Sequence, residues 1–186
     1  MPDRRRLIVA GSRQFARPSV VRYALTQAQD GYRPEEMQLV HGQCDPRTSS
    51  GHRIPWRAAK DLPEMTQRLL YGADWQADFA AVELGWPEPE RHPADWRRRH
   101  AAGPERNVRM VARGGDGGHA FLSAGLRNAG TVGCAVLMAK AGIPVLFWCD
   151  ACCEAPPVPV SAFTPCETHQ LDEVGATWRR RTGVLL

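Results

Sequence analysis

Residues 6–13, Arg6-Leu7-Ile8-Val9-Ala10-Gly11-Ser12-Arg13, decide the fold class of this chain. A short apolar run that ends in a glycine is typical of a buried parallel strand followed by a tight turn. We therefore predict a first strand over residues 6–10. The turn at residues 10–13 combines a residue without a Cβ, a hydroxyl and a guanidinium, a composition that suits a loop cradling a phosphate.

The alternation of apolar strand and helix continues along the chain. Apolar spacing predicts helices over residues 19–30, 74–84, 104–112 and 132–141, and strands over residues 37–41, 89–92, 119–123 and 142–148. Asp74 and Thr131 are placed to cap their helices, and Val108 and Val111 are expected to face inward. This order predicts a Rossmann-like α/β fold, an open, mostly parallel sheet of about five strands with helices on both faces.

Two segments break this rhythm. Residues 43–70 contain prolines and a Thr-Ser-Ser-Gly stretch, and we interpret them as an inserted loop that can serve as a lid. Residues 149–186 are rich in cysteine and proline and form a short tail after the last predicted strand. The predicted organisation is thus a Rossmann-like domain over residues 1–148 followed by this tail.

The composition is that of an ordinary globular protein. The chain has 186 residues, of which 43% are hydrophobic and 24% charged, enough for one domain with a small appendage. Its apolar runs fall short of the roughly 20 residues that a membrane span needs. We expect a cytoplasmic protein without a membrane partner. The net charge of +4 comes from scattered arginines, so nucleic acid is not the expected partner but stays an alternative.

Ligands of open parallel sheets bind beyond the carboxyl ends of the strands, where helices begin. Three glycine loops are predicted at that edge: Gly11-Ser12-Arg13, His41-Gly42 and Gly130-Thr131. In each, the missing Cβ allows close approach of a ligand. Together they predict a nucleotide-type pocket.

Several motifs occur in the order found in one known family. They are Val9-Ala10-Gly11-Ser12-Arg13, Val40-His41-Gly42, Gly72-Ala73-Asp74, Pro93-Ala94-Asp95-Trp96, Ala102-Gly103-Pro104-Glu105-Arg106-Asn107-Val108-Arg109-Met110, Gly130-Thr131 and Ala139-Lys140-Ala141-Gly142-Ile143-Pro144-Val145. On these residues the chain resembles the SLOG superfamily, in particular its YspA-like branch of bacterial and phage proteins. The resemblance covers about residues 7–148 and implies a Rossmann-like domain that binds nucleotides or molecules derived from them.

The resemblance also bears on catalysis. The related LOG phosphoribohydrolases use a Gly-Thr-x-x-Glu motif, whose glutamate works with an arginine on a neighbouring helix. Arg106 matches that arginine, but Cys134 stands where the glutamate is expected. Hydrolysis of the LOG type therefore lacks its carboxylate. The remaining acids, Asp74 and Asp95, are alternative catalytic groups beside Arg106, although one can equally cap a helix and the other fix a turn.

We therefore expect a sensor or sequestering domain for a nucleotide-derived small molecule. A hydrolase that cleaves an N-glycosidic or phosphate bond of a nucleotide is the first alternative, and a nucleic-acid-binding module is the second. Homo-oligomer formation is left open. The expected ligand-binding residues are Gly11, Ser12, Arg13, His41, Gly42, Asp95, Trp96, Gly103, Arg106, Asn107, Gly130 and Thr131.

The tail carries a second candidate site. Cys149-x-x-Cys152 and Cys166-x-x-His169 have the spacing of small structural zinc sites, with Cys153 as a substitute ligand. Structural zinc is the only cofactor that the sequence suggests. The alternative is a set of unligated thiols, since Cys149 ends an apolar run where cysteine acts as a small hydrophobe. Cys44 and Cys134 lie far from this group in the sequence.

Overall fold

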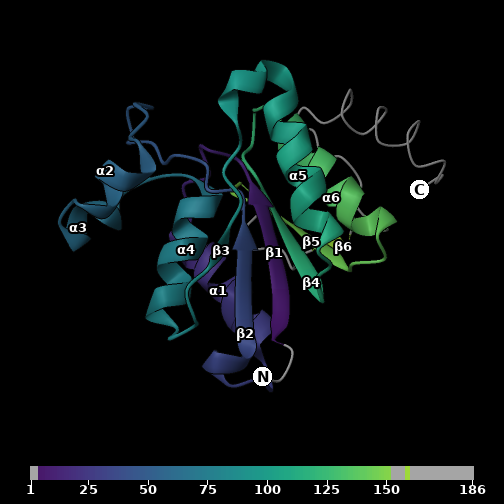
Figure 1. The fold of residues 1–186 in the computed structure, drawn as a ribbon. Helices are drawn as coiled ribbons and strands as arrows, with labels where there is room; N and C mark the ends of the chain where they lie inside the picture. The colour runs from purple at the N-terminus through teal and green to yellow at the C-terminus, as the bar shows by residue number, and fades with distance from the viewer. Residues whose placement is uncertain (1–3, 152–157, 160–186) are drawn as a thin grey trace.

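The computed structural model describes residues 4–151 and the backbone of residues 158–159. Within them a sheet of six strands has the order β3-β2-β1-β4-β5-β6. The strands are β1 (Arg5–Gly11), β2 (Met37–His41), β3 (Glu90–Arg91), β4 (Gly117–Leu122), β5 (Val145–Cys149) and β6 (Val158–Pro159). β1 to β5 are parallel, and β6 is antiparallel to β5. The predicted Rossmann-like α/β fold is confirmed (Figure 1).

Side chains of β1 alternate between two apolar cores because successive residues of a strand point to opposite faces. Leu7 and Val9 pack with α1 (Pro18–Gln29) and α4 (Ala73–Glu83), whereas Ile8 and Ala10 pack with α5 (Ala102–Ala112) and α6 (Ala129–Lys140). Both faces of the sheet are therefore buried. A strand buried on both faces needs a continuous apolar run, which residues 7–10 supply.

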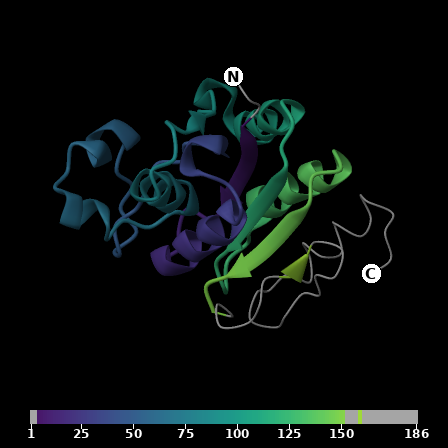
Figure 2. The same ribbon diagram turned by 90° about the horizontal axis from the view of Figure 1, so that it is seen from below.

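The inserted segment carries two short helices, α2 (Trp56–Lys60) and α3 (Glu64–Gln67). Its ends meet where the backbones of Arg47 and Tyr71 bond to each other in both directions, at 3.0 and 2.7 Å. Trp56 packs edge-on against Trp75 of α4 in a small separate core. α2 and α3 stand apart from the sheet beyond α4 in both views (Figures 1 and 2).

Three local expectations are corrected. Gly72, with a positive φ, precedes α4 as its N-cap, so Asp74 lies inside the first turn and caps nothing. α6 begins at Ala129 after Asn128, so Thr131 is likewise inside its helix rather than at the cap. Val108 is 51% exposed, because the buried face of α5 runs through Arg106, Asn107, Met110 and Val111. That face contains polar residues, which apolar periodicity does not detect.

The predicted turn at Asp95 is present as the start of the 3₁₀ helix η2 (Trp96–Ala101), where its carboxylate accepts the N–H of Arg97. A second 3₁₀ helix, η1 (Pro34–Glu36), leads into β2. Within the described part of the chain, no helix has the length and apolar character needed to cross a membrane.

Candidate functional site

A cleft of about 1320 Å³ lies at the carboxyl ends of β1 and β4. β2 and β4 pair on opposite sides of β1, so the chain reverses its direction of winding there. Open α/β sheets bind ligands at such a reversal, because the loops on either side diverge and leave a crevice. The walls come from the loop after β1, the turn after β2, the start of α4, and helices α5 and α6.

Most of the expected ligand-binding residues line this cleft: Gly11, Ser12, Arg13, Gly42, Gly103, Arg106, Asn107, Gly130 and Thr131. His41, Asp95 and Trp96 are not among the lining residues. Trp96 contacts a lining residue, since the Arg13 guanidinium lies over its ring, 5.0 Å from the centroid. Asp95 is paired with the exposed Arg97.

Arg106 is the most deeply placed cation of the cleft, and its side chain is only 9% exposed. Its Nε donates to the side-chain oxygen of Asn107 at 2.8 Å, and Asn107 in turn donates to the backbone oxygen of Gly130. Its Nη2 contacts Cys44 Sγ at 3.6 Å. Two of the three guanidinium nitrogens are thus held, one by Asn107 of α5 and one by Cys44 of the turn after β2.

The third nitrogen, Nη1, is buried and has no hydrogen-bond acceptor among the described residues. Asp74 Oδ2 lies 4.0 Å from it, which gives an ion pair without a hydrogen bond. Burial acts to lower the pKa of Arg106, but the nearby Asp74, Cys44 and Cys134 together outweigh it and the pKa is raised. The guanidinium therefore stays charged, and a buried charged donor without an acceptor is a feature that a bound anion accounts for.

The N-terminus of α6 opens into the same cleft. The first intrahelical bond is donated by Val132 to Asn128, so the three N–H groups before it have no helical acceptor. The side chain of Asn128 does not cap them, because it bonds to both backbone groups of Ser123 and to the oxygen of Leu126. Unpaired N–H groups and the helix dipole make this end a favourable place for an anion.

Small residues keep the space in front of this helix open. A Cβ added at Gly130 or Gly133 meets no atom within 4 Å, and the same holds for Gly103 of α5. All three glycines line the cleft. Ligand atoms can therefore come close to the backbone of both helices.

The loop after β1 has fewer free backbone N–H groups for binding a phosphate than its sequence predicts. The N–H of Ser12 donates to the backbone oxygen of Phe121, and the N–H groups of Gln14 and Phe15 are both bonded to Ser12 itself. The first of these bonds holds the loop against β4, and the other two are formed within the loop. The donors that remain available in the cleft thus come chiefly from α5 and α6.

Charge favours an anionic ligand. The charged residues that line the cleft are Arg13, Arg47, Asp74, Arg106, Arg127 and Lys140, five cations and one carboxylate. Asp74 is also committed to structure, since its Oδ2 accepts the N–H of Cys44 at 2.9 Å. The cleft is therefore electropositive.

The thiols at this site are poor nucleophiles. Burial raises the pKa of Cys44 above its usual value, with a further contribution from Asp74, despite the nearby Arg106. Burial also raises the pKa of Cys134 to about 12. Both stay protonated near neutral pH. Cys134 lies on the buried face of α6, within the apolar core, so it cannot replace a catalytic glutamate.

The second candidate site lies largely outside the described residues. Cys152, Cys153, Cys166 and His169 belong to the parts of the tail that the structure does not describe, so the zinc site stays a prediction. Cys149 is buried at the end of β5, where its Sγ accepts the N–H of Ala151 at 3.4 Å. Residues 4–151 contain no cluster of three or more His, Cys, Asp or Glu side chains suited to a metal ion.

Sequence reasoning missed a second polar cluster, behind the turn that follows β2. Asp78 of α4 is completely buried and accepts bonds from Lys60 at 2.5 Å, Arg91 at 2.7 Å and His41 at 3.1 Å. Burial acts to raise its pKa, but these three donors outweigh burial and the pKa falls well below the usual value for aspartate. A signal was present: Asp74 and Asp78 lie one turn apart on an alanine-rich helix, where a buried charge needs partners.

No protein-family model, curated protein or solved structure matches the chain.

Proposed function

We propose that the cleft binds a nucleotide-derived small molecule through its phosphate and does not hydrolyse it as LOG enzymes do. The observation that carries this proposal is the buried Arg106, whose Nη1 has no acceptor among the described residues. A phosphate oxygen bound in the cleft supplies an acceptor for that nitrogen. The uncapped N-terminus of α6 supplies further donors on the other side.

The rest of the ligand has room beside the phosphate. Where the cleft borders α5 and α6, its lining includes Val108, Gly133 and Leu137, and this part of the cleft is the proposed ligand groove. A flat, partly apolar group such as a nucleobase fits a groove floored by glycine and walled by aliphatic side chains. The proposed ligand thus combines a phosphate with a base or a similar apolar group.

Binding can be measured by isothermal titration calorimetry with AMP and ADP-ribose, using adenosine as the phosphate-free comparison. We expect Arg106→Gln to weaken binding about tenfold to a hundredfold, since it removes a charged hydrogen-bond donor. Arg109→Gln is the matched control, because Arg109 is exposed on the same helix and does not line the cleft. Equal affinities for AMP and adenosine, or equal losses in both variants, would contradict the proposal.

A hydrolase is the second candidate, and the position of Asp74 supports it as the acid of that reaction. Asp74 lines the cleft and is buried beside Arg106, whereas Asp95 pairs with Arg97 outside it. Asp74 is the only carboxylate among the cleft-lining residues of the described chain. This candidate predicts release of a base or of phosphate during incubation with AMP or ADP-ribose, followed by chromatography.

A further inference from the structure

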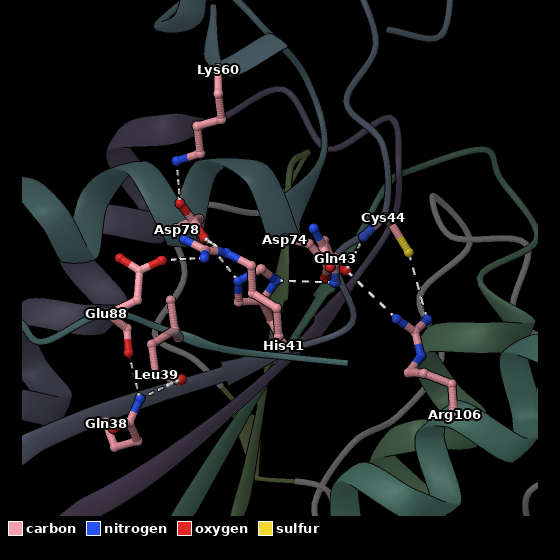
Figure 3. Close-up of polar contacts among 11 residues, drawn as sticks. Gln38, Leu39, His41, Gln43, Cys44, Lys60, Asp74, Asp78, Glu88 and Arg106 are labelled. Carbon is pink, nitrogen blue, oxygen red and sulfur yellow. Dashed lines mark hydrogen bonds and ion pairs between the residues drawn. The ribbon is translucent and has the colours of Figure 1, made fainter. Parts of the chain in front are cut away.

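The turn of residues 41–44, His41-Gly42-Gln43-Cys44, connects the two polar clusters. His41 ends β2 on the face covered by α4 and points toward Asp78, whereas Cys44 at the other end points toward Arg106 of the cleft (Figure 3). His41 is fully buried and does not line the cleft. The proposed binding of phosphate gives it no role.

The hydrogen bonds of His41 determine which ring nitrogen carries the proton. The backbone N–H of Gln43 donates to Nδ1 at 3.1 Å, so Nδ1 must be the acceptor. Nε2 then carries the hydrogen and donates to Asp78 Oδ2 at 3.1 Å. Asp78 is itself fixed by Lys60 and Arg91, and the His41 ring stacks on Trp56. The imidazole is thus held in one orientation by the surrounding elements.

The contact between His41 and Gln43 supports an unfavourable backbone conformation. Gln43 has a φ of +50°, in the left-handed region that favours glycine. A side chain there costs on the order of 1 kcal/mol and persists only where its surroundings enforce it. Two hydrogen bonds hold Gln43 in this conformation. One runs from the Gln43 N–H to Nδ1 of His41, and the other from the Cys44 N–H to Asp74.

The shape of this turn determines where Arg106 lies. A Cβ at Gly42 would overlap Nη1 and Cζ of Arg106, so the guanidinium rests directly on the backbone of the turn. Cys44, one residue beyond Gln43, places its Sγ at 3.6 Å from Nη2. If Gln43 relaxes to a negative φ, the backbone of Gly42 and the Sγ of Cys44 both move. The Arg106 guanidinium then loses the contacts that position it.

We propose that His41 is a positioning residue for Arg106: through its Nδ1 it holds the 41–44 turn in the conformation on which the guanidinium rests. This inference depends on the proposed function only in the prediction that ligand affinity follows the position of Arg106. The competing interpretation is a histidine that merely fills the core. Under the positioning role, loss of the contact between His41 and Gln43 displaces Arg106 even when the overall stability of the protein is unchanged. Under the core-filling role, it does not.

Two substitutions separate these interpretations. His41→Asn can place its side-chain oxygen near Nδ1 and keep the acceptor for Gln43, but it loses the donor to Asp78. His41→Gln can place its amide nitrogen near Nε2 and keep that donor, but it loses the acceptor. Both remove the ring that stacks on Trp56, so they should destabilise the protein to a similar extent. A difference between them therefore reports the contact to Gln43.

The first readout needs no ligand. Solvent exchange of the Arg106 Nε–H, which is bonded to Asn107, can be followed by ¹⁵N NMR. We expect slow exchange in the wild type and in His41→Asn, and exchange at least about tenfold faster in His41→Gln. Equal exchange rates in the two variants would overturn the inference.

The second readout is the affinity for ADP-ribose. We expect His41→Gln to weaken binding about fivefold or more, and His41→Asn to stay close to the wild type. In an Arg106→Gln background the effect of His41→Gln should vanish, because the group it positions is gone. A full additional loss in that background would overturn the inference. Failure of the wild type to bind ADP-ribose would count against the proposed function, while the exchange measurement still decides the role of His41.

A measurement on the wild type covers the case in which the variants do not fold. The ¹⁵N chemical shifts of the His41 ring should show Nε2 protonated and Nδ1 as the acceptor. The opposite tautomer would contradict the bond to Gln43 and overturn the inference.

Discussion

The guanidinium of Arg106 rests on the backbone of Gly42, so closely that any side chain at residue 42 would occupy its position. Arg106 comes from α5 and Gly42 from the turn after β2, and both line the cleft. The glycine at this position is therefore required by the contact rather than by a turn conformation. It couples the shape of one loop to the placement of the buried cation.

Replacing Gly42 by alanine should displace Arg106 and weaken AMP binding by about tenfold or more, because the added Cβ overlaps the guanidinium. We also expect a loss of roughly 1–3 kcal/mol in the free energy of unfolding from overpacking, measured by urea denaturation. Gly117→Ala is the control, since its Cβ would make only an ordinary contact with Leu7. An unchanged AMP affinity in Gly42→Ala would mean that Arg106 does not contact the phosphate.

Asp74→Asn separates a binding protein from a hydrolase. The amide oxygen can still accept the N–H of Cys44, but the negative charge that faces Arg106 is removed. For a phosphate-binding cleft we expect affinity for AMP to rise roughly threefold to tenfold, because one repulsive charge is lost. For a hydrolase that uses this carboxylate, product release should disappear instead. Calorimetry and chromatography on the same variant give the answer.

Gly133→Ala should stabilise the protein and impair the cleft at the same time. Glycine inside a helix costs about 0.5–1 kcal/mol relative to alanine, and the added methyl group meets no atom within 4 Å. The midpoint of thermal unfolding should therefore rise. Because the methyl group projects into the proposed ligand groove, AMP affinity should fall. A more stable protein with unaltered affinity would indicate that the ligand does not use this groove.

Acid should destabilise the fold through His119. Burial lowers the pKa of His119 to about 4, below its ordinary value of 6.5, because the charged ring is poorly solvated. The unfolded chain therefore takes up the proton more readily than the folded one. The stability is complete above pH 6.5 and is lost as the pH falls from 6.5 toward 4, by up to about 3 kcal/mol.

Urea denaturation between pH 7 and pH 4 measures this loss. His119→Asn should flatten the profile in that range, because asparagine keeps an acceptor for the indole N–H of Trp148 but does not titrate. The same acid loss in the variant would assign the effect to another group.

The order of elements and the region of the site could be predicted from residues that are close in the sequence. The apolar run of β1 reports a requirement that this strand carries by itself. The glycines after β1 and β2 mark the ends of their strands in the sequence, although the contacts that require them are tertiary. These patterns predict that the loops after β1 and β2 lie at the same edge of the sheet, and the cleft lies at that edge. The same local patterns could not distinguish Asp74 as a helix cap from Asp74 as a partner of the 41–44 turn, since a carboxylate in a first turn suits both.

The sequence alone thus determined a parallel α/β sheet and the edge at which its glycine loops gather, because strand and helix periodicity are local properties. Only the tertiary structure decided that Arg106 rests on Gly42, that Cys44 touches it, and that His41 faces Asp78 rather than the cleft. These contacts join residues that are 37 to 64 positions apart in the sequence. The energy of a buried charge depends on such distant partners, and no local pattern of residues encodes them.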